Sequence, residues 1–292
     1  MTQLFLSCDV VRSVSFLFRF FDYFFEGACS HVANHCSRHF NREASVFYDR
    51  LVSGGFDPNA HIDVLPQHRL LYISNPKCAS TTIKMVLSSL ARNQLDTSDQ
   101  LHKRRYSGLK SPKRGGISAF HEVATHPAAF RFSFVRNPYS RLVSTWADKF
   151  QNKPLVCGDS FIDQYLMNRD WIDETLPKGA DSTLSFPQFV QFAAATANRR
   201  LDAHWHLQDD LLTMPGIKLD LVGKVESFAE DFASVLDHAG AGVRLRQIAD
   251  VHFNASQHQP WPNYYTAGLA DRAYRAYERD FDRFNYSRTI PA

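Results

Sequence analysis

Two short apolar runs in this chain are each followed by a polar turn and a stretch with helical periodicity. The first run covers residues 70–73, and Pro76 follows it closely. Beyond the turn, Ile83, Val86 and Leu90 recur at the spacing of one helix face. Because proline lacks an N–H and disfavours the α region before it, the strand ends there. The pattern predicts a buried strand, a tight turn and a helix.

The turn between this strand and helix carries the chemistry of an anion site. Residues 77–82 contain a lysine, a serine and two threonines beside the unpaired N–H groups of a helix start. The helix dipole favours negative charge at that end, so we expect a ligand with tetrahedral anionic oxygens. The turn has no glycine and lacks the G-x-x-x-x-G-K-[ST] spacing of nucleoside triphosphatases. A lysine with hydroxyl donors suits a phosphate or sulfate that is neutralised without a metal.

The second run has phenylalanine or valine at positions 130, 132, 134 and 135, and it predicts another strand. Pro138 fits the first turn of the helix that follows. Arg136 therefore lies at the carboxyl end of a strand, and Ser144 lies two turns into the next helix. In an open α/β sheet, ligands bind at that edge.

The remaining elements divide the chain no further. The pattern predicts a loop at residues 53–67 and a helix at residues 185–195. It then predicts a short strand at residues 219–222, a helix from residue 226 onward and a closing helix at residues 266–284. We predict one α/β domain over residues 61–292, with a central, mainly parallel sheet flanked by helices on both faces. A helical, aromatic-rich extension is expected over residues 1–60.

Composition indicates a globular protein, with 44% hydrophobic and 22% charged residues. The net charge of +3 does not by itself indicate nucleic-acid binding. Six basic residues and no acidic one lie between Lys103 and Arg114. This segment is either a solvated loop or a flap over an anionic substrate.

Five scattered cysteines without a C-x-x-C pair favour reduced thiols, and no apolar run approaches the roughly 18 to 20 residues of a membrane span. A cytoplasmic protein is therefore expected, with peripheral membrane contact through the aromatic N-terminal segment as the alternative. His31, His35 and His39 would share one helical face, but no second ligand cluster follows them. We expect no metal site.

The two polar turns resemble motifs of one enzyme family. NPKCASTTIK resembles the 5′-phosphosulfate loop of carbohydrate sulfotransferases that use 3′-phosphoadenosine-5′-phosphosulfate (PAPS), and FSFVRNPYSRLVSTWADKF resembles their 3′-phosphate motif. The resemblance covers about residues 68–286 and implies the P-loop-NTPase-like sulfotransferase fold. Many animal members of the family carry an N-terminal membrane anchor and disulfides, and this sequence shows the pattern of neither, so we expect a soluble member of bacterial type. Weaker matches occur at His204 and Trp205, at Gly223, Lys224 and Glu226, and at residues 277–286.

This resemblance implies a role for each motif residue. Lys77 would stabilise the charge on the leaving phosphate, and Arg136 and Ser144 would hold the 3′-phosphate. The 5′-phosphate would lie against the rest of the loop, formed by Cys78, Ala79, Ser80, Thr81 and Thr82. The implied reaction is in-line transfer of a sulfuryl group to a hydroxyl of a carbohydrate or glycolipid, with no metal required.

The general base is the least determined residue, because relatives use a histidine or a glutamate between the two motifs. We predict His121, which stands shortly before the second strand and has a suitable reference pKa. Glu122, His126 and His204 stay open as alternatives. The acceptor itself is not determined by the sequence.

Two other functions fit parts of this pattern. A kinase-like enzyme that binds nucleoside phosphates would use a similar sheet, but the missing glycine spacing opposes it. A catalytically inactive glycan-binding protein could keep the same fold. The sequence does not determine the oligomeric state.

Overall fold

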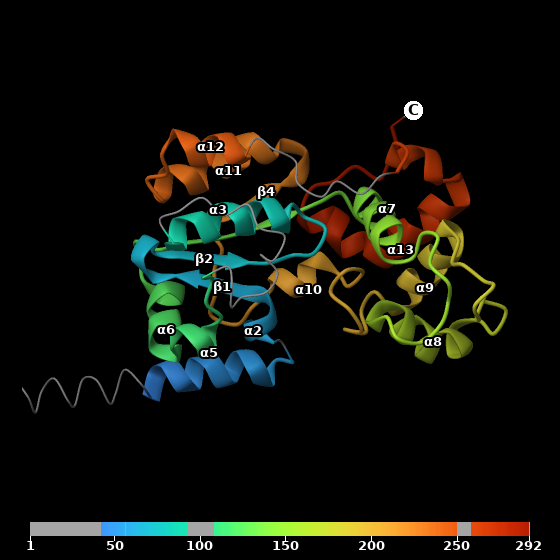
Figure 1. Ribbon diagram of the computed structural model, residues 1–292, viewed down its shortest axis with the longest axis horizontal. Coiled ribbons are helices and arrows are strands. Elements are labelled where there is room, and N and C mark those ends of the chain that lie inside the picture. Colours follow the sequence, from blue (N-terminus) through green and yellow to red (C-terminus); the bar gives the residue numbers. More distant parts are fainter. Residues whose placement is uncertain (1–41, 56, 93–107, 250–257, 292) are drawn as a thin grey trace, which may run out of the picture.

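The computed structural model describes residues 42–55, 57–92, 108–249 and 258–291, and the fold is built on a four-stranded sheet with the order β1-β2-β3-β4. The strands are β1 (Ile62–Leu65), β2 (Leu70–Ile73), β3 (Phe130–Val135) and β4 (Leu221–Lys224). β1 runs antiparallel to β2, whereas β2, β3 and β4 are parallel. The parallel strands therefore end at one common edge (Figure 1).

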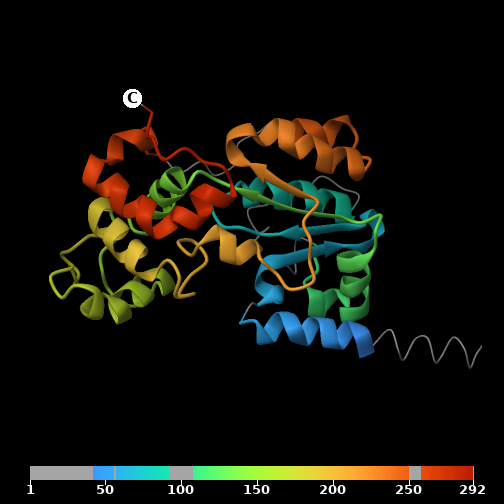
Figure 2. The same cartoon turned by 180° about the vertical axis from the view of Figure 1, so that it is seen from behind.

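Helices cover both faces of this sheet. One face carries α3 (Ser80–Arg92), α11 (Phe228–His238) and α12 (Val243–Ala249). The other face carries the helix of residues 42–53 together with α2 (Pro58–His61), α5 (Pro112–Gly115) and α6 (Ile117–Thr125). Figure 2 shows the same layers from behind, with β4 in front of β3 and β2. Each face has its own core of buried apolar side chains.

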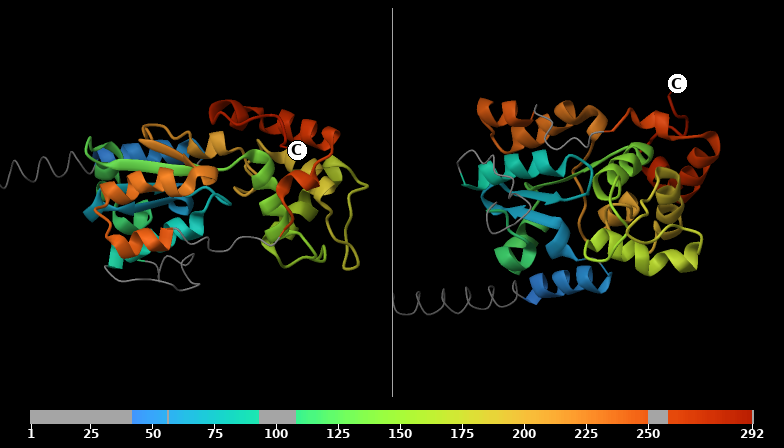
Figure 3. Two further views of the ribbon diagram at one scale, coloured as in Figure 1. Left: turned by 90° about the horizontal axis from the view of Figure 1, so that it is seen from above. Right: turned by 45° about the vertical axis from the view of Figure 1, so that its right-hand side comes forward.

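A second group of helices lies beyond the carboxyl ends of β2 and β3. It contains α7 (Pro138–Lys149), α8 (Ser160–Ile172), α9 (Phe186–Thr196) and α13 (Ala267–Arg283), with α10 (Gln208–Leu212) between it and the sheet (Figure 1 and Figure 3). Short 3₁₀ turns complete the chain at η1 (Pro66–His68), η2 (Val225–Ser227) and η3 (Trp261–Tyr264). Trp205 is fully buried in the aromatic core of this group. The sheet edge that ligands favour therefore faces a helical wall.

The helix that follows β3 starts where its sequence dictates. The side chain of Asn137 accepts hydrogen bonds from the N–H groups of Tyr139 and Ser140, and Pro138 occupies the first turn, where its missing N–H costs nothing. α9 begins with a capping box between Ser185 and Gln188. These caps fix the helices that border the sheet edge.

The predicted α/β class with a mainly parallel sheet flanked by helices is confirmed. The apolar runs at 70–73 and 130–135 are β2 and β3, and helices begin after Ser185 and Thr266 as predicted. The predicted strand at 219–222 is β4, which starts two residues later, at Leu221. The described residues contain no helix long and apolar enough to cross a membrane.

The prediction of a loop over residues 53–67 was wrong, because this stretch contains α2 and β1. The strand has only four residues, all buried, and it pairs antiparallel with β2 from Ile62 to Leu65. Such a short run between two prolines lacks the alternation that marks a strand in sequence. His31, His35 and His39, at which the sequence predicts no metal site, and the basic residues 103–105 lie outside the described residues. The division at residue 60 stays a prediction.

Candidate active site

The turn after β2 adopts a backbone conformation that suits an anion. Lys77 and Ala79 both have positive φ, at 65° and 56°, although neither is glycine. The first helical hydrogen bond of α3 runs from the Ile83 N–H to the Ala79 carbonyl, so the N–H groups of residues 80–82 precede it. Left-handed residues before a helix start form anion-binding concavities and store strain at functional sites. The backbone thus prepares this turn for a phosphate or sulfate group.

Arg136 follows β3 and lies beside this turn. Its Nη1 donates to the Lys77 carbonyl at 3.4 Å, and its Nε donates to the Ser140 hydroxyl at 2.9 Å. Burial lowers the pKa of Arg136 from its ordinary value, and the nearby Glu226 carboxylate opposes that effect. Ser144 lies one turn beyond Ser140 on α7 and is 3% exposed. The structure therefore brings Lys77 and Arg136 together, and Ser140 joins them as a residue that the sequence did not single out.

Gln208, at the start of α10, joins the two strand ends. Its side-chain oxygen accepts hydrogen bonds from the Asn75 amide and from the Arg136 N–H, both at 3.0 Å. Its amide nitrogen donates to the Arg136 carbonyl at 2.9 Å. Gln208 is fully buried, and its own N–H donates to the buried carboxylate of Asp280 at 2.9 Å. One amide side chain thus sets the spacing of the turns that follow β2 and β3.

Lys77 forms an ion pair across the site with Asp148 on α7, with Nζ 3.2 Å from Oδ2. The lysine side chain is 13% exposed and the aspartate side chain 41%. Burial lowers the pKa of Lys77, and the Asp148 charge opposes this shift. Asp148 also pairs with Lys149 at 3.0 Å, and the two lysines hold its pKa below the usual range despite its partial burial. Asp148 therefore stays ionised beside the lysine of the turn.

Arg141 on α7 ties the turn to the segment between α9 and α10. Its Nε donates to the Pro76 carbonyl at 3.2 Å, its Nη1 to the His206 carbonyl at 2.8 Å and its Nη2 to the Ala203 carbonyl at 2.5 Å. The residue is 2% exposed. A guanidinium can satisfy several carbonyls at once because its donors form a rigid fork. Arg141 thus fixes three backbone segments relative to α7.

Cys78 packs beneath the turn and has no reactive thiol. It is fully buried, and burial raises the pKa of its thiol to about 12. The thiol donates to the Gln208 side-chain oxygen at 3.3 Å. Since the thiolate is the reactive form, this cysteine is a packing residue at the base of the site. Its side chain points to Gln208, so only its backbone is left to face an anion.

The chain belongs to the sulfotransferase family, whose model matches residues 60–287. Among its relatives, carbohydrate sulfotransferase 8 of Mus musculus is 31% identical over 78% of this chain and 57% of its own length. Carbohydrate sulfotransferase 11 of Danio rerio is 29% identical over 78% of this chain and 67% of its own length. The chain thus spans little more than half of the first relative. No solved structure gives a significant match.

Two of the weaker motif matches of this sulfotransferase-family chain, the segment with Glu226 and the one that ends at Tyr286, meet beside Arg136. The Glu226 carboxylate accepts from the Asn137 N–H at 2.8 Å and from the Tyr286 hydroxyl at 2.9 Å. A side chain at Gly223 would come within 2.5 Å of the Phe134 ring, so glycine is needed where β4 passes that ring. Residues that are distant in sequence therefore support the turn after β3.

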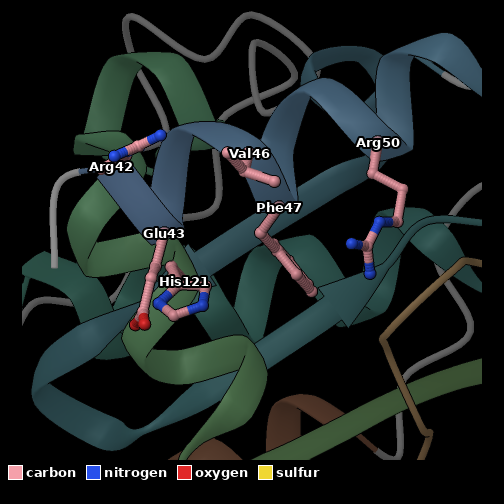
Figure 4. A pocket seen from close by; sticks show the side chains of 6 residues that line it. All are labelled: Arg42, Glu43, Val46, Phe47, Arg50 and His121. Atoms are coloured by element: carbon pink, nitrogen blue, oxygen red, sulfur yellow. The ribbon is translucent and has the colours of Figure 1, made fainter. Parts of the chain in front are cut away.

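His121 lies on a different face of the molecule. α6 covers the sheet face opposite α3, and the His121 ring contacts Phe47 at 5.1 Å between centroids (Figure 1). Figure 4 shows His121 beside Glu43 in a pocket of about 390 Å³ between α6 and the helix of residues 42–53. The remaining lining residues are Arg42, Val46, Phe47 and Arg50. This placement does not support His121 as the general base, and its assignment stays a prediction.

Glu122 shares α6 with His121, and His126 lies at the amino end of β3. The His126 carbonyl accepts a hydrogen bond from Arg131 Nη1 at 3.1 Å, and Arg131 is the second residue of β3. Arg136 follows the other end of that six-residue strand, which spans roughly 20 Å. Of the four candidates for the base, the structure brings only His204 close to α7, where Thr145 donates to its carbonyl at 3.0 Å.

The sequence did not indicate the roles of Gln208, Arg141, Asp148 or Ser140. Gln208, Arg141 and Asp148 each contact a residue more than 50 positions away in the sequence. Ser140 instead contacts Arg136, which lies one helical turn before it. The Ser140 signal was present in the sequence, because Ser140 and Ser144 share one helix face. The other three had no local signal.

Proposed function

We propose that this protein transfers a sulfuryl group from PAPS to a hydroxyl group of a carbohydrate. The observation that carries the proposal is the contact between Arg136 and the Lys77 carbonyl, which places the two cofactor motifs side by side at the carboxyl edge of β2 and β3. Family membership and the carbohydrate sulfotransferase relatives support the reaction class. A glycolipid acceptor and a cytoplasmic location stay predictions.

The residues present fit this donor. One end of the site has Lys77 and the N–H groups before the first hydrogen bond of α3, which suit the 5′-phosphosulfate. The other end has Arg136 with the hydroxyls of Ser140 and Ser144 on one face of α7, which suit the 3′-phosphate. Lys77 would neutralise charge that develops on the leaving phosphate, and Arg136 and the serines would fix the position of the nucleotide.

Binding of 3′-phosphoadenosine-5′-phosphate (PAP), the product nucleotide, tests this proposal by calorimetry. Wild type is expected to bind, and Arg136→Ala is expected to bind about 10- to 150-fold more weakly, since hydrogen bonds to charged groups contribute about 1.5–3 kcal/mol each. Arg275→Ala is the matched control, because Arg275 is exposed on α13 and pairs only with Asp271 among the described ion pairs. Absence of PAP binding in wild type would refute the proposed function.

Asp148→Asn is expected to bind PAP about fivefold more tightly than wild type. Asp148 holds Lys77 in an ion pair, and its charge repels the phosphates that would replace it. The gain is modest because the carboxylate is 41% exposed and therefore screened by water. The comparison is Asp170→Asn on α8, whose carboxylate pairs with Arg169. Weaker PAP binding by Asp148→Asn would mean that Asp148 positions Lys77 instead of competing for it.

A further inference from the structure

The segment between α9 and α10 presents a second set of polar side chains next to the site. Within this segment, the backbone around His204 accepts hydrogen bonds from side chains of α7. The Thr145 hydroxyl donates to the His204 carbonyl at 3.0 Å, and Arg141 donates to the Ala203 carbonyl at 2.5 Å. Thr145 is fully buried and Arg141 is 2% exposed. The backbone that carries His204 is therefore fixed by two buried side chains.

Asp202 sets the orientation of the His204 ring. Its Oδ1 atom accepts the His204 backbone N–H at 2.8 Å and lies 2.7 Å from the ring Nδ1. Because a carboxylate can only accept, Nδ1 carries the proton and Nε2 of the neutral ring has the lone pair. No hydrogen bond within the described part of the chain is assigned to Nε2, and the side chain is 23% exposed. The ring thus has the form and access of a proton acceptor.

The same turn of α7 connects this ring to Lys77. Thr145 holds the His204 backbone, and Asp148, three residues later on the same helix face, pairs with Lys77. Lys149 lies between Asp148 and Phe161: its Nζ is 3.0 Å from the Asp148 carboxylate and 4.4 Å from the centre of the Phe161 ring. Phe161 in turn meets the His204 ring edge-on at 4.9 Å. Side-chain contacts through Phe161, Lys149 and Asp148 therefore link the His204 ring to Lys77.

Burial favours the neutral form of the His204 ring. Burial lowers its pKa below the ordinary value, and the positive charges of Lys149 and Arg141 lower it further. The Asp202 carboxylate opposes this shift from the other side. A group with a lowered pKa loses its proton at a lower pH, so the ring is ready to accept a proton at neutral pH.

We propose that His204 is the general base for the acceptor hydroxyl and that Asp202 is its positioning residue. The inference rests on the proposed function and deepens it. As the acceptor oxygen forms its bond to sulfur, the hydroxyl proton passes to His204 Nε2. The bond between sulfur and the bridging oxygen breaks, and its electron pair leaves with the 5′-phosphate that Lys77 faces. His206 is less suited, because it is 3% exposed and its Nε2 faces Asp210 at 3.4 Å.

Transfer of ³⁵S from labelled PAPS to a panel of desulfated glycosaminoglycans and neutral oligosaccharides tests the base directly. His204→Gln is expected to lower the turnover rate about 100-fold, the usual contribution of a general base, with PAP affinity within twofold of wild type. His121→Gln tests the rival base that the sequence predicted, and it is expected to lower turnover far less than His204→Gln does. Retained turnover in His204→Gln, or its loss in His121→Gln alone, would overturn the assignment. If wild type does not bind PAP, the proposed function itself is refuted, which is a different outcome from a wrong choice of base.

Nitrogen-15 NMR of the imidazole rings needs no acceptor and tests the ring itself. We expect His204 in wild type to be protonated at Nδ1 and to titrate below its ordinary pKa. Asp202→Asn is expected to lower the His204 pKa further, because the opposing carboxylate charge is lost, and to change the preferred tautomer. A wild-type ring that is protonated at Nε2 at neutral pH would overturn the proposal, since it could not accept the proton there.

Discussion

Replacement of Lys77 by alanine is expected to lower the rate of sulfuryl transfer by about 10³-fold. Lys77 is held in a left-handed conformation shortly before the start of α3, and its side chain is mostly buried. Stabilisation of charge that develops only in the transition state is often the largest single contribution to catalysis, and removal of one such donor costs about 10²- to 10³-fold. The loss should appear in the turnover rate more than in PAP affinity, because the backbone amides of the turn persist.

Single-turnover measurements with labelled PAPS check this expectation, because they separate chemistry from nucleotide release. Lys153→Ala is the matched control: Lys153 lies just beyond α7, is 38% exposed and pairs with Asp159 at 3.5 Å. Its loss should leave turnover unchanged. A Lys77→Ala variant with a turnover rate within tenfold of wild type would show that the amides and Arg136 supply the charge stabilisation without the lysine.

Arg141→Met is expected to reduce the free energy of unfolding by about 3–5 kcal/mol. The change removes the donors of three carbonyls: that of His206, in a buried contact, and those of Pro76 and Ala203, in partly buried ones. A buried acceptor without a partner costs about 1–3 kcal/mol, and methionine restores the volume but none of the hydrogen bonds. The same variant should weaken PAP binding, because the turn of Lys77 loses its attachment to α7.

Urea unfolding followed by circular dichroism measures this effect, with Arg275→Met as the control. Arg275 is 78% exposed, so its loss should change the free energy of unfolding by less than about 0.5 kcal/mol. A decrease below about 1 kcal/mol for Arg141→Met would mean that the three carbonyls find other partners.

Local sequence was enough to locate β2, β3 and the helices that follow them. Each strand is a short apolar run that ends at a proline-containing turn, and each following helix has one apolar face. Strands followed by crossover helices give a parallel sheet, and a parallel sheet brings Lys77 and Arg136 to one edge. The two ends of the candidate donor site were therefore predictable, because their positions depend on neighbours close in the chain.

Local sequence could not predict the antiparallel strand β1 or the hydrogen bonds and ion pairs that Gln208 and Asp148 form at the site. β1 is only four residues long, and its pairing with β2 decides that it is a strand. Gln208 connects Asn75 with Arg136, and Asp148 reaches Lys77 from 71 positions away in the sequence. Such contacts have no local pattern, because they form only when separate elements pack.

The choice of base shows the same division. Sequence order favoured His121, which lies between the two motifs, but α6 carries it to the sheet face opposite α3. His204 lies far from both motifs in sequence, yet Thr145 and Arg141 hold its segment against the helix that also contacts Lys77. The sequence by itself determined the residues proposed to meet the two ends of an anionic donor, since these follow directly from strand–turn–helix units. Only the tertiary structure decided which side chains face them, because that depends on how α7 packs against segments distant in the chain.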